Sequence, residues 1–219
     1  MRILPGLALL LAADVTRAAQ PAWTLERDTD GIRVYARTEE GYSLKAFRAV
    51  MVVDAPLAAP VALLSDAENF PGWYAGCAHN RVLRRLSGTD VLSYFVHDAP
   101  FPVMDRDVVV RTTVTQDPQT GVVTFTIRNV PGEIPEQPDK VRIPRMASSW
   151  RLTPRSATTT EVVQETRTDL GGSVPAFLAN RQVTSAPVDR LRNMRKWLEK
   201  PRYRDAVVDF ATGAVTWGR

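Results

Sequence analysis

The sequence is poor in the residues that build metal centres and nucleophilic active sites. It holds one cysteine, Cys77, and two histidines, His79 and His97, among 219 residues. A single cysteine excludes an intrachain disulfide framework and any metal site with several thiolate ligands. Cys77 and His79 lie two positions apart, so their side chains share a face only in a strand. We therefore expect no catalytic cysteine–histidine pair, no bound metal and no cofactor.

The sequence also lacks an apolar run long enough to span a bilayer. Residues Ile3–Ala13 are apolar apart from one proline and one glycine, about half of the ~20 residues that a spanning helix needs. Arg2 precedes this run and Thr16–Ala18 follows it, an order typical of a secretory signal peptide. The alternative is an amphipathic N-terminal helix, but no polar face repeats at helical spacing. The pattern predicts a signal peptide over 1–19 and export to the periplasm or outside the cell.

Charge and composition describe an ordinary globular chain with a mild basic excess. The formal net charge is +4 and the pI is about 9.5, with 44% hydrophobic and 24% charged residues. A basic surface favours anionic partners such as phospholipid headgroups or nucleic acid. The basic residues are scattered, however, and no helix combines a basic stripe with interleaved aromatic residues. We expect no nucleic-acid binding, whereas transient contact with an anionic membrane stays open.

Hydrophobic periodicity predicts a run of strands closed by a long helix. Alternation or short apolar runs between turn residues predict strands over Ile32–Arg37, Leu44–Val53, Arg81–Leu86, Val91–Val96, Asp107–Thr115, Val122–Val130, Val141–Leu152 and Thr159–Asp169. Helical spacing predicts a helix over Leu57–Leu64, followed by a short helical turn or loop over Asp66–Pro71. It also predicts a helix over Val174–Lys200, which Pro187 should kink or divide. An antiparallel sheet with one buried face needs such a helix as cover. The sheet and its covering helix enclose either a packed core or a cavity. The tail 201–219 could form a weak hairpin.

Four segments, in order along the chain, resemble the StAR-related lipid-transfer (START) domain family. They are Trp23–Arg37, Pro100–Asp107, Ile134–Pro154 and Thr168–Pro175. The chain is identified as a bacterial-type member of that family within the helix-grip (Bet v 1-like) superfamily. The resemblance implies an α+β helix-grip fold, a curved antiparallel sheet wrapped around a long C-terminal helix. It also implies an internal apolar cavity for a sterol, phospholipid or similar lipid, formed by a domain over 20–200.

Two of these segments have a direct physical interpretation. Arg106 stands between Asp105 and Asp107, and a planar guanidinium can satisfy two carboxylates, so we expect a structural ion-pair network there. Asp169–Gly172 ends a strand and permits a sharp turn into the C-terminal helix, with Pro175 in the first turn of that helix. Both features are expected to serve the scaffold.

We predict that inward aromatic and aliphatic side chains contact the lipid, although each could equally be packed core. The candidates are Trp73, Phe95, Phe101, Phe125, Trp150, Phe177 and Leu178. Thr112 is the inward polar position of its strand, and its neighbour Arg111 should face away. Val91–Val96 contains no carboxylate, so the acid–base pair of sterol-binding family members is missing. Arg142 and Arg145 either meet an anionic headgroup or lie exposed.

The sequence therefore predicts a monomeric protein that binds a hydrophobic ligand for transfer or sensing, not an enzyme. The basic residues beyond Arg190 on the C-terminal helix could meet an anionic membrane. The alternative is a cyclase or hydrolase on the same fold, which needs a general acid or base in the cavity. Tyr94, His97 and Asp98 are the candidate cluster for that role. Alternation separates Tyr94 from His97, which counts against it.

Overall fold

The protein is built around one curved sheet that closes over its helices. The computed structural model describes residues 21–219, so the predicted signal peptide over 1–19 lies outside the described residues. The strands are β1 (Thr24–Thr29), β2 (Ile32–Arg37), β3 (Ala46–Val53), β4 (Cys77–Ser87), β5 (Asp90–His97), β6 (Asp105–Gln116), β7 (Val123–Asn129), β8 (Lys140–Arg142), β9 (Arg145–Pro154), β10 (Thr160–Asp169), β11 (Val207–Asp209) and β12 (Ala214–Thr216). The helices are α1 (Ala58–Ser65), α2 (Phe70–Trp73), α3 (Ala176–Thr184), α4 (Ala186–Leu198) and α5 (Pro201–Arg204).

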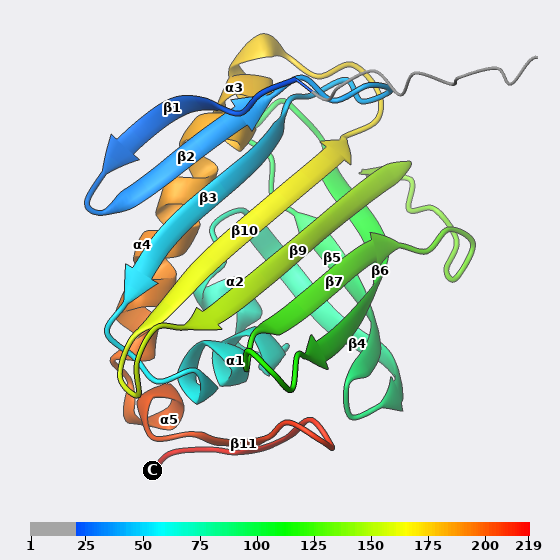
Figure 1. The fold of residues 1–219 in the computed structure, drawn as a ribbon. Helices are drawn as coiled ribbons and strands as arrows, with labels where there is room; N and C mark the ends of the chain where they lie inside the picture. The colour runs from blue at the N-terminus through cyan, green and yellow to red at the C-terminus, as the bar shows by residue number, and fades with distance from the viewer. Residues whose placement is uncertain (1–20) are drawn as a thin grey trace, which may run out of the picture.

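Ten strands form the main sheet, in the order β1-β2-β3-β10-β9-β7-β6-β5-β4, with β8 paired to β6. Neighbours along the main path are antiparallel, and β8 runs parallel to β6. Figure 1 shows the sheet curving so that its two ends enclose α1 and α2, while α3 and α4 cross one open side. No helix of the described part of the chain is long and apolar enough to cross a membrane.

Alternation along the strands decides which face is buried. In β2, Ile32, Val34 and Ala36 are buried, whereas the residues between them are exposed or half-buried. Successive side chains of a strand point to opposite faces, so this pattern turns one face of the sheet toward the helices. The expected strand Val141–Leu152 is divided into β8 and β9, because Pro144 lies between them and cannot donate a ladder hydrogen bond.

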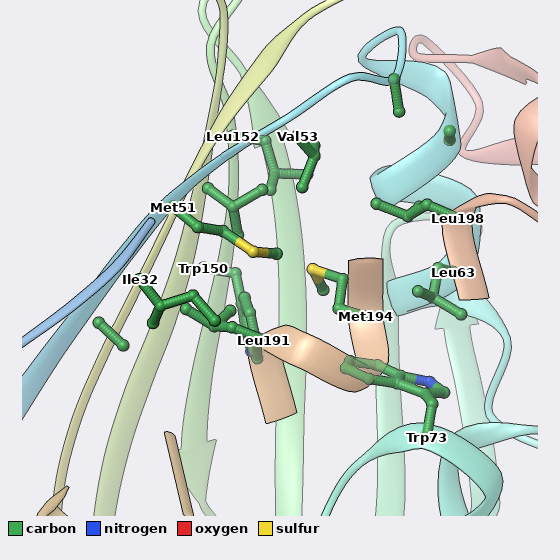
Figure 2. Packing of buried hydrophobic residues seen from close by; sticks show 14 of the residues in the cluster. Ile32, Met51, Val53, Leu63, Trp73, Trp150, Leu152, Leu191, Met194 and Leu198 are labelled. Atoms are coloured by element: carbon green, nitrogen blue, oxygen red, sulfur yellow. The ribbon is translucent and has the colours of Figure 1, made fainter. Parts of the chain in front are cut away.

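The C-terminal helix packs its apolar stripe into the core. The predicted helix is divided into α3 and α4 at Ser185, and Pro187, which has no N–H for the preceding turn, lies in the first turn of α4. Leu191 and Met194 are fully buried, and α4 contacts β2, β3, α1 and α2. Figure 2 shows Met51 of β3 and Met194 of α4 pointing toward one another across this core. Apolar contact on both sides of α4 fixes it against the β1–β3 end of the sheet.

The tail folds back onto α1 rather than extending away. Asp66, which follows α1, accepts hydrogen bonds from Arg202 Nε at 3.0 Å and from Tyr203 Oη at 3.1 Å. Tyr203 is fully buried, and burial together with the Asp66 carboxylate raises its pKa to about 12. After α5, β11 and β12 form the C-terminal hairpin, Val207–Thr216, which lies beneath α1 in Figure 1. The weak hairpin expected in the tail is therefore present and docked.

Candidate functional site

A cavity of about 440 Å³, partly open to solvent, lies between the concave face of the sheet and the segment that carries α1 and α2. The sheet wall is apolar, formed mainly by Val82, Val91, Phe95, Val108, Val110, Val114, Phe125, Ile127 and Trp150. The opposite wall comes from Leu64, Phe70 and Tyr74, together with Val215 and Trp217 at the C-terminal hairpin. Such a volume falls within the ~300–1,000 Å³ of small-molecule pockets, which are likewise mostly apolar with a few polar groups.

Strand β6 supplies the clearest part of the sheet wall. Val108, Val110, Thr112 and Val114 line the cavity at two-residue spacing, as one face of a strand requires. Arg111 points the other way and forms an ion pair with Asp90 at 2.5 Å. The expected orientations of Thr112 and Arg111 are therefore confirmed by the positions of their side chains.

A cluster of aromatic rings lines one end of the cavity. Tyr74 stacks on Phe70 with ring centroids 4.7 Å apart, and its edge meets Phe95 at 5.7 Å. The Gln164 side-chain amide donates a hydrogen bond to Tyr74 Oη at 3.2 Å. Edge-to-face and offset contacts of this kind are favourable for aromatic rings. They hold the Tyr74 ring in place as a wall of the cavity.

The C-terminal hairpin caps the other end of the cavity, where it meets the β4–β5 turn. Thr212, Gly213 and Ala214 line the cavity beside Gly88. A Cβ added to Gly213, which has a φ of +73°, would lie 2.4 Å from the Gly88 carbonyl oxygen. Only a residue without a side chain fits such a close backbone approach. The two turns therefore meet in direct backbone contact.

Four of the sequence-predicted site residues come together in the cavity wall. They are Phe95, Thr112, Phe125 and Trp150. Trp73 is 1% exposed and belongs to the packed core, where its ring meets Trp150 edge-on at 6.2 Å. Leu178 is also buried and lies outside the lining of the cavity.

The remaining candidates lie away from the cavity. Phe101 is 96% exposed and Phe177 is 55% exposed. Arg142 binds Asp107 through both carboxylate oxygens, at 2.8 and 3.0 Å. That carboxylate, fully buried on the other face of β6, also accepts a hydrogen bond from Tyr94 Oη at 3.0 Å. Arg142 therefore holds a buried ion pair together, outside the cavity.

The expected ion pairs of Arg106 with its two neighbouring aspartates are absent from the described residues, and that prediction was wrong. Adjacent residues of a strand point to opposite faces, so Arg106 shares the cavity face with Val108 while Asp105 and Asp107 face away. Asp105 accepts a hydrogen bond from the Ala99 amide at 3.0 Å. Arg106 is 2% exposed, donates from Nη1 to the Met104 carbonyl, and has no partner at Nε.

Cys77, His79 and Tyr94 do not line the cavity. A register irregularity in β4 lies between Cys77 and His79, and it leaves Cys77 buried while His79 is exposed. Burial raises the pKa of the Cys77 thiol to about 12, so it stays protonated. Tyr94 faces the side of β5 away from the cavity, where burial and Asp107 raise its pKa to about 12. The described residues contain no cluster suited to a metal ion.

The sequence interpretation missed the wall formed by α2 and the C-terminal hairpin. It placed the long C-terminal helix over the cavity, but α3 and α4 do not line it; Phe70, Tyr74, Val215 and Trp217 do. The aromatic residues of the segment 70–74 were visible in the sequence. No periodicity, however, assigned them or the tail to a cavity wall.

A curved antiparallel sheet with a C-terminal helix defines a helix-grip fold of the α+β class. The chain belongs to the START domain family, whose profile matches residues 10–204. An uncharacterized protein of Pseudomonas aeruginosa is 35% identical over 178 residues, 81% of this chain and 87% of that protein. The C-terminal hairpin lies beyond the part of the chain that the profile matches.

Solved structures with the same fold include a STAR-related lipid transfer protein from Xanthomonas axonopodis. It is 34% identical, has a TM-score of 0.74, and the match covers 81% of this chain and 99% of that one. Human StAR-related lipid transfer protein 5 is 18% identical with a TM-score of 0.75, covering 84% and 89% of the two chains. An aromatase/cyclase from Streptomyces sp. R1128 is 15% identical with a TM-score of 0.53, covering 71% and 94%. The last two likenesses show the fold alone.

Proposed function

We propose that this protein binds one small lipid in the cavity and carries or senses it, without catalysing a reaction. The observation that carries this proposal is the 440 Å³ cavity with aromatic and aliphatic walls. Membership of the START domain family supports it, as does the 34% identity to a protein described as a STAR-related lipid transfer protein. A cavity of this volume suits a ligand of drug-like size, such as a single-chain or polycyclic lipid.

Apolar walls are sufficient to bind such a ligand. Removing one methylene group from water contributes about 0.8 kcal/mol, so a dozen methylenes contribute on the order of 10 kcal/mol. Part of this is offset by the lost translational and rotational freedom of the ligand. No covalent chemistry is required, which agrees with a protonated Cys77 thiol and with Tyr94 facing away from the cavity.

Access to the cavity is proposed to lie at the α3 end, next to the loop that joins β5 to β6. His97 ends β5 and contacts Gln182 of α3, so the loop 98–104 begins beside that helix. Phe101 at 96% exposure, Phe177 at 55% and Met104 at 45% give these two segments exposed apolar side chains. Exposed apolar side chains can insert at a membrane surface. We infer that α3 and this loop meet the membrane when lipid enters or leaves.

Two of the basic residues beyond Arg190 form contacts within the protein. Arg192 forms an ion pair with Asp30 at 2.5 Å, and Arg195 donates to the Asp30 carbonyl at 3.0 Å. These contacts tie α4 to the β1–β2 turn. We therefore assign membrane contact to Phe101 and Phe177. We also propose that residues 1–19 direct export and that the protein is a monomer.

The test is native mass spectrometry of the purified protein, followed by extraction and identification of any bound lipid. One lipid equivalent per monomer is expected, and dodecanol added to stripped protein should form a one-to-one complex. A protein that carries no lipid and binds no added dodecanol would overturn the proposal. Transfer of a pyrene-labelled lipid between vesicles separates the two roles, because a carrier accelerates transfer whereas a sensor does not. A mature N-terminus near residue 19 or 20 in the periplasmic fraction would test export.

A further inference from the structure

A second, smaller void adjoins the main cavity beneath α3. Its volume is about 50 Å³, and it shares the wall residues Tyr74, Phe95 and Met146 with the main cavity. Its other walls come from β3 and the end of β10, with Gln182 of α3 and Arg190 of α4 completing it. The void therefore borders the main cavity across these three side chains, at the end where access is proposed. Its lining differs from that of the main cavity because it includes a buried cation.

Arg190 is 3% exposed and forms no ion pair within the described part of the chain. Its Nε donates to the Ala75 carbonyl at 3.1 Å, and its Nη2 donates to Gln182 Oε1 at 3.2 Å. The guanidinium carbon lies 4.6 Å from the centre of the Tyr74 ring. Nη1 donates to no residue among 21–219, although it belongs to a guanidinium that lines the void. The guanidinium that lines the void therefore has more N–H donors than the two protein acceptors it contacts.

Gln182 and His97 hold this guanidinium in place. The Gln182 side-chain amide contacts His97 Nε2 while its carbonyl oxygen accepts from Arg190. Burial, together with the charges of Arg190, Arg106 and Arg181, lowers the pKa of His97 to about 3. The imidazole is therefore neutral at physiological pH, and its Nε2 can accept the Gln182 amide proton. His97 adds no charge to the void and fixes the orientation of Gln182.

Arg106 brings a second buried guanidinium to the same end of the cavity. It precedes Val108 by two residues on the same face of β6 and pairs in register with His97 of β5. It is 2% exposed, its Nε has no partner, and none of the ion pairs among residues 21–219 involves it. Lys45 also lines the void, but it forms an ion pair with Glu26 at 3.2 Å. The buried positive charge without an ion pair at this end therefore comes from Arg106 and Arg190.

Two buried arginines without a neighbouring carboxylate lower the stability of the folded protein. Arginine stays protonated, and a buried charge without an ion partner loses its hydration. An anion in the void would supply the missing charge and accept the free N–H donors. We propose that the void binds the carboxylate or phosphate group of an amphipathic lipid whose chain lies in the main cavity. Arg190, which lines the void, is its cationic contact, and Gln182 and His97 are positioning residues. Arg106 does not line the void but adds positive charge beside His97, with which it pairs in register. This assignment rests on the proposed function.

The size of the void restricts the headgroup. About 50 Å³ accommodates a group of a few heavy atoms, given that one water molecule occupies about 30 Å³ in the liquid. A carboxylate or an unsubstituted phosphate fits this description. The void is partly open to solvent, so a larger headgroup would extend out of it. We therefore take a fatty acid or an alkyl phosphate as the ligand class.

The test compares three probes with the same chain: dodecanol, dodecanoate and dodecyl phosphate. The wild-type protein should bind at least one of the anions at least tenfold more tightly than dodecanol. Arg190→Gln should bring the ratio of the dodecanol Kd to the anion Kd down to about one, and Arg106→Gln should lower the same ratio. Arg192→Gln, which changes a half-buried arginine of the same helix that pairs with Asp30, should retain the preference. Whichever anion is preferred distinguishes a carboxylate ligand from a phosphate ligand.

A measurement on the unaltered protein guards against variants that fail to fold. The ¹³C shift of carboxyl-labelled dodecanoate, followed with pH, should give the bound acid a pKa below that of the free acid, because nearby cations favour the carboxylate. A carboxyl held by apolar walls alone would show a raised pKa. Equal binding of all three probes, together with a raised pKa of bound dodecanoate, would overturn the anion site and leave the lipid cavity intact. Failure of all three to bind would overturn the proposed function as well.

Discussion

Thr112 offers the sharpest test of the claim that the space beneath the sheet belongs to a ligand rather than to the core. It lines the cavity from the middle of β6, and Thr113 beside it points to the other face of the same strand. Thr112→Phe places a ring in the cavity, and Thr113→Phe places the same ring outside it. The pair therefore separates loss of cavity volume from a general effect on β6.

The expected loss of affinity follows from the atoms added. Phenylalanine has about four more side-chain heavy atoms than threonine, and they displace about four methylenes of bound ligand. At about 0.8 kcal/mol per methylene, binding of dodecanol should weaken by about 3 kcal/mol, or roughly 100-fold in Kd. Thr113→Phe should change the Kd less than about threefold.

Stability should respond differently from binding. A ring that enters empty space forces no neighbour to move, so Thr112→Phe should keep the free energy of unfolding within about 1 kcal/mol of wild type or raise it. A ring forced into a packed core costs about 1–3 kcal/mol. Tryptophan fluorescence titration with dodecanol gives the Kd, and urea unfolding followed by circular dichroism gives the stability. Unchanged affinity, or a destabilisation of 2–3 kcal/mol, would refute the existence of an accessible cavity.

Three further predictions concern the core, the buried imidazole and the C-terminal hairpin. Met194→Ala should lower the free energy of unfolding by about 2–5 kcal/mol in urea titrations, because Met194 is fully buried, whereas Lys196→Ala on the exposed face should change it by less than about 0.5 kcal/mol. The pKa of His97 is about 3 in the folded protein and about 6.5 when unfolded, so between these values the unfolded state binds more protons and the free energy of unfolding should fall as the pH decreases from 6.5 toward 3. His97→Gln should flatten this pH dependence, whereas His79→Gln should not. Equal pH profiles of stability for the two variants would contradict the assignment. Trp217→Ala removes a cavity wall residue of the hairpin region, so stopped-flow measurements should show faster release of dodecanol. An unchanged release rate would show that the hairpin end of the cavity does not limit release of the ligand.

Much of the fold could be predicted because alternation and helical spacing are local properties. Ile32–Arg37 alternated in the sequence and forms β2 with the same bounds. The apolar spacing of α4 placed Leu191 and Met194 on its buried face, and Pro187 predicted the division of the C-terminal helix. The position of a residue within a strand also fixed its face, which is why Thr112 points into the cavity and Arg111 does not.

The candidate site could be predicted only in part, because periodicity gives a side chain its face but not what covers that face. Phe95 and Trp150 were expected inside and line the cavity, whereas Trp73 is equally buried but belongs to the core. Phe101 is aromatic and lies in solvent. Arg106 was expected to pair with its sequence neighbours, and alternation along β6 turns those neighbours to the other face.

The sequence by itself determined the α+β class, most of the strands, the apolar stripe of the last helix and the family to which the chain belongs. Each of these depends on neighbours within a few positions, or on motifs in a fixed order. Only the tertiary structure decided that α2 and the C-terminal hairpin, rather than the C-terminal helix, form the wall opposite the sheet. It alone placed Arg106 and Arg190 at one end of the cavity without a carboxylate. These residues lie 84 positions apart, and the charge balance of a buried site depends on which distant segments the curvature of the sheet brings together.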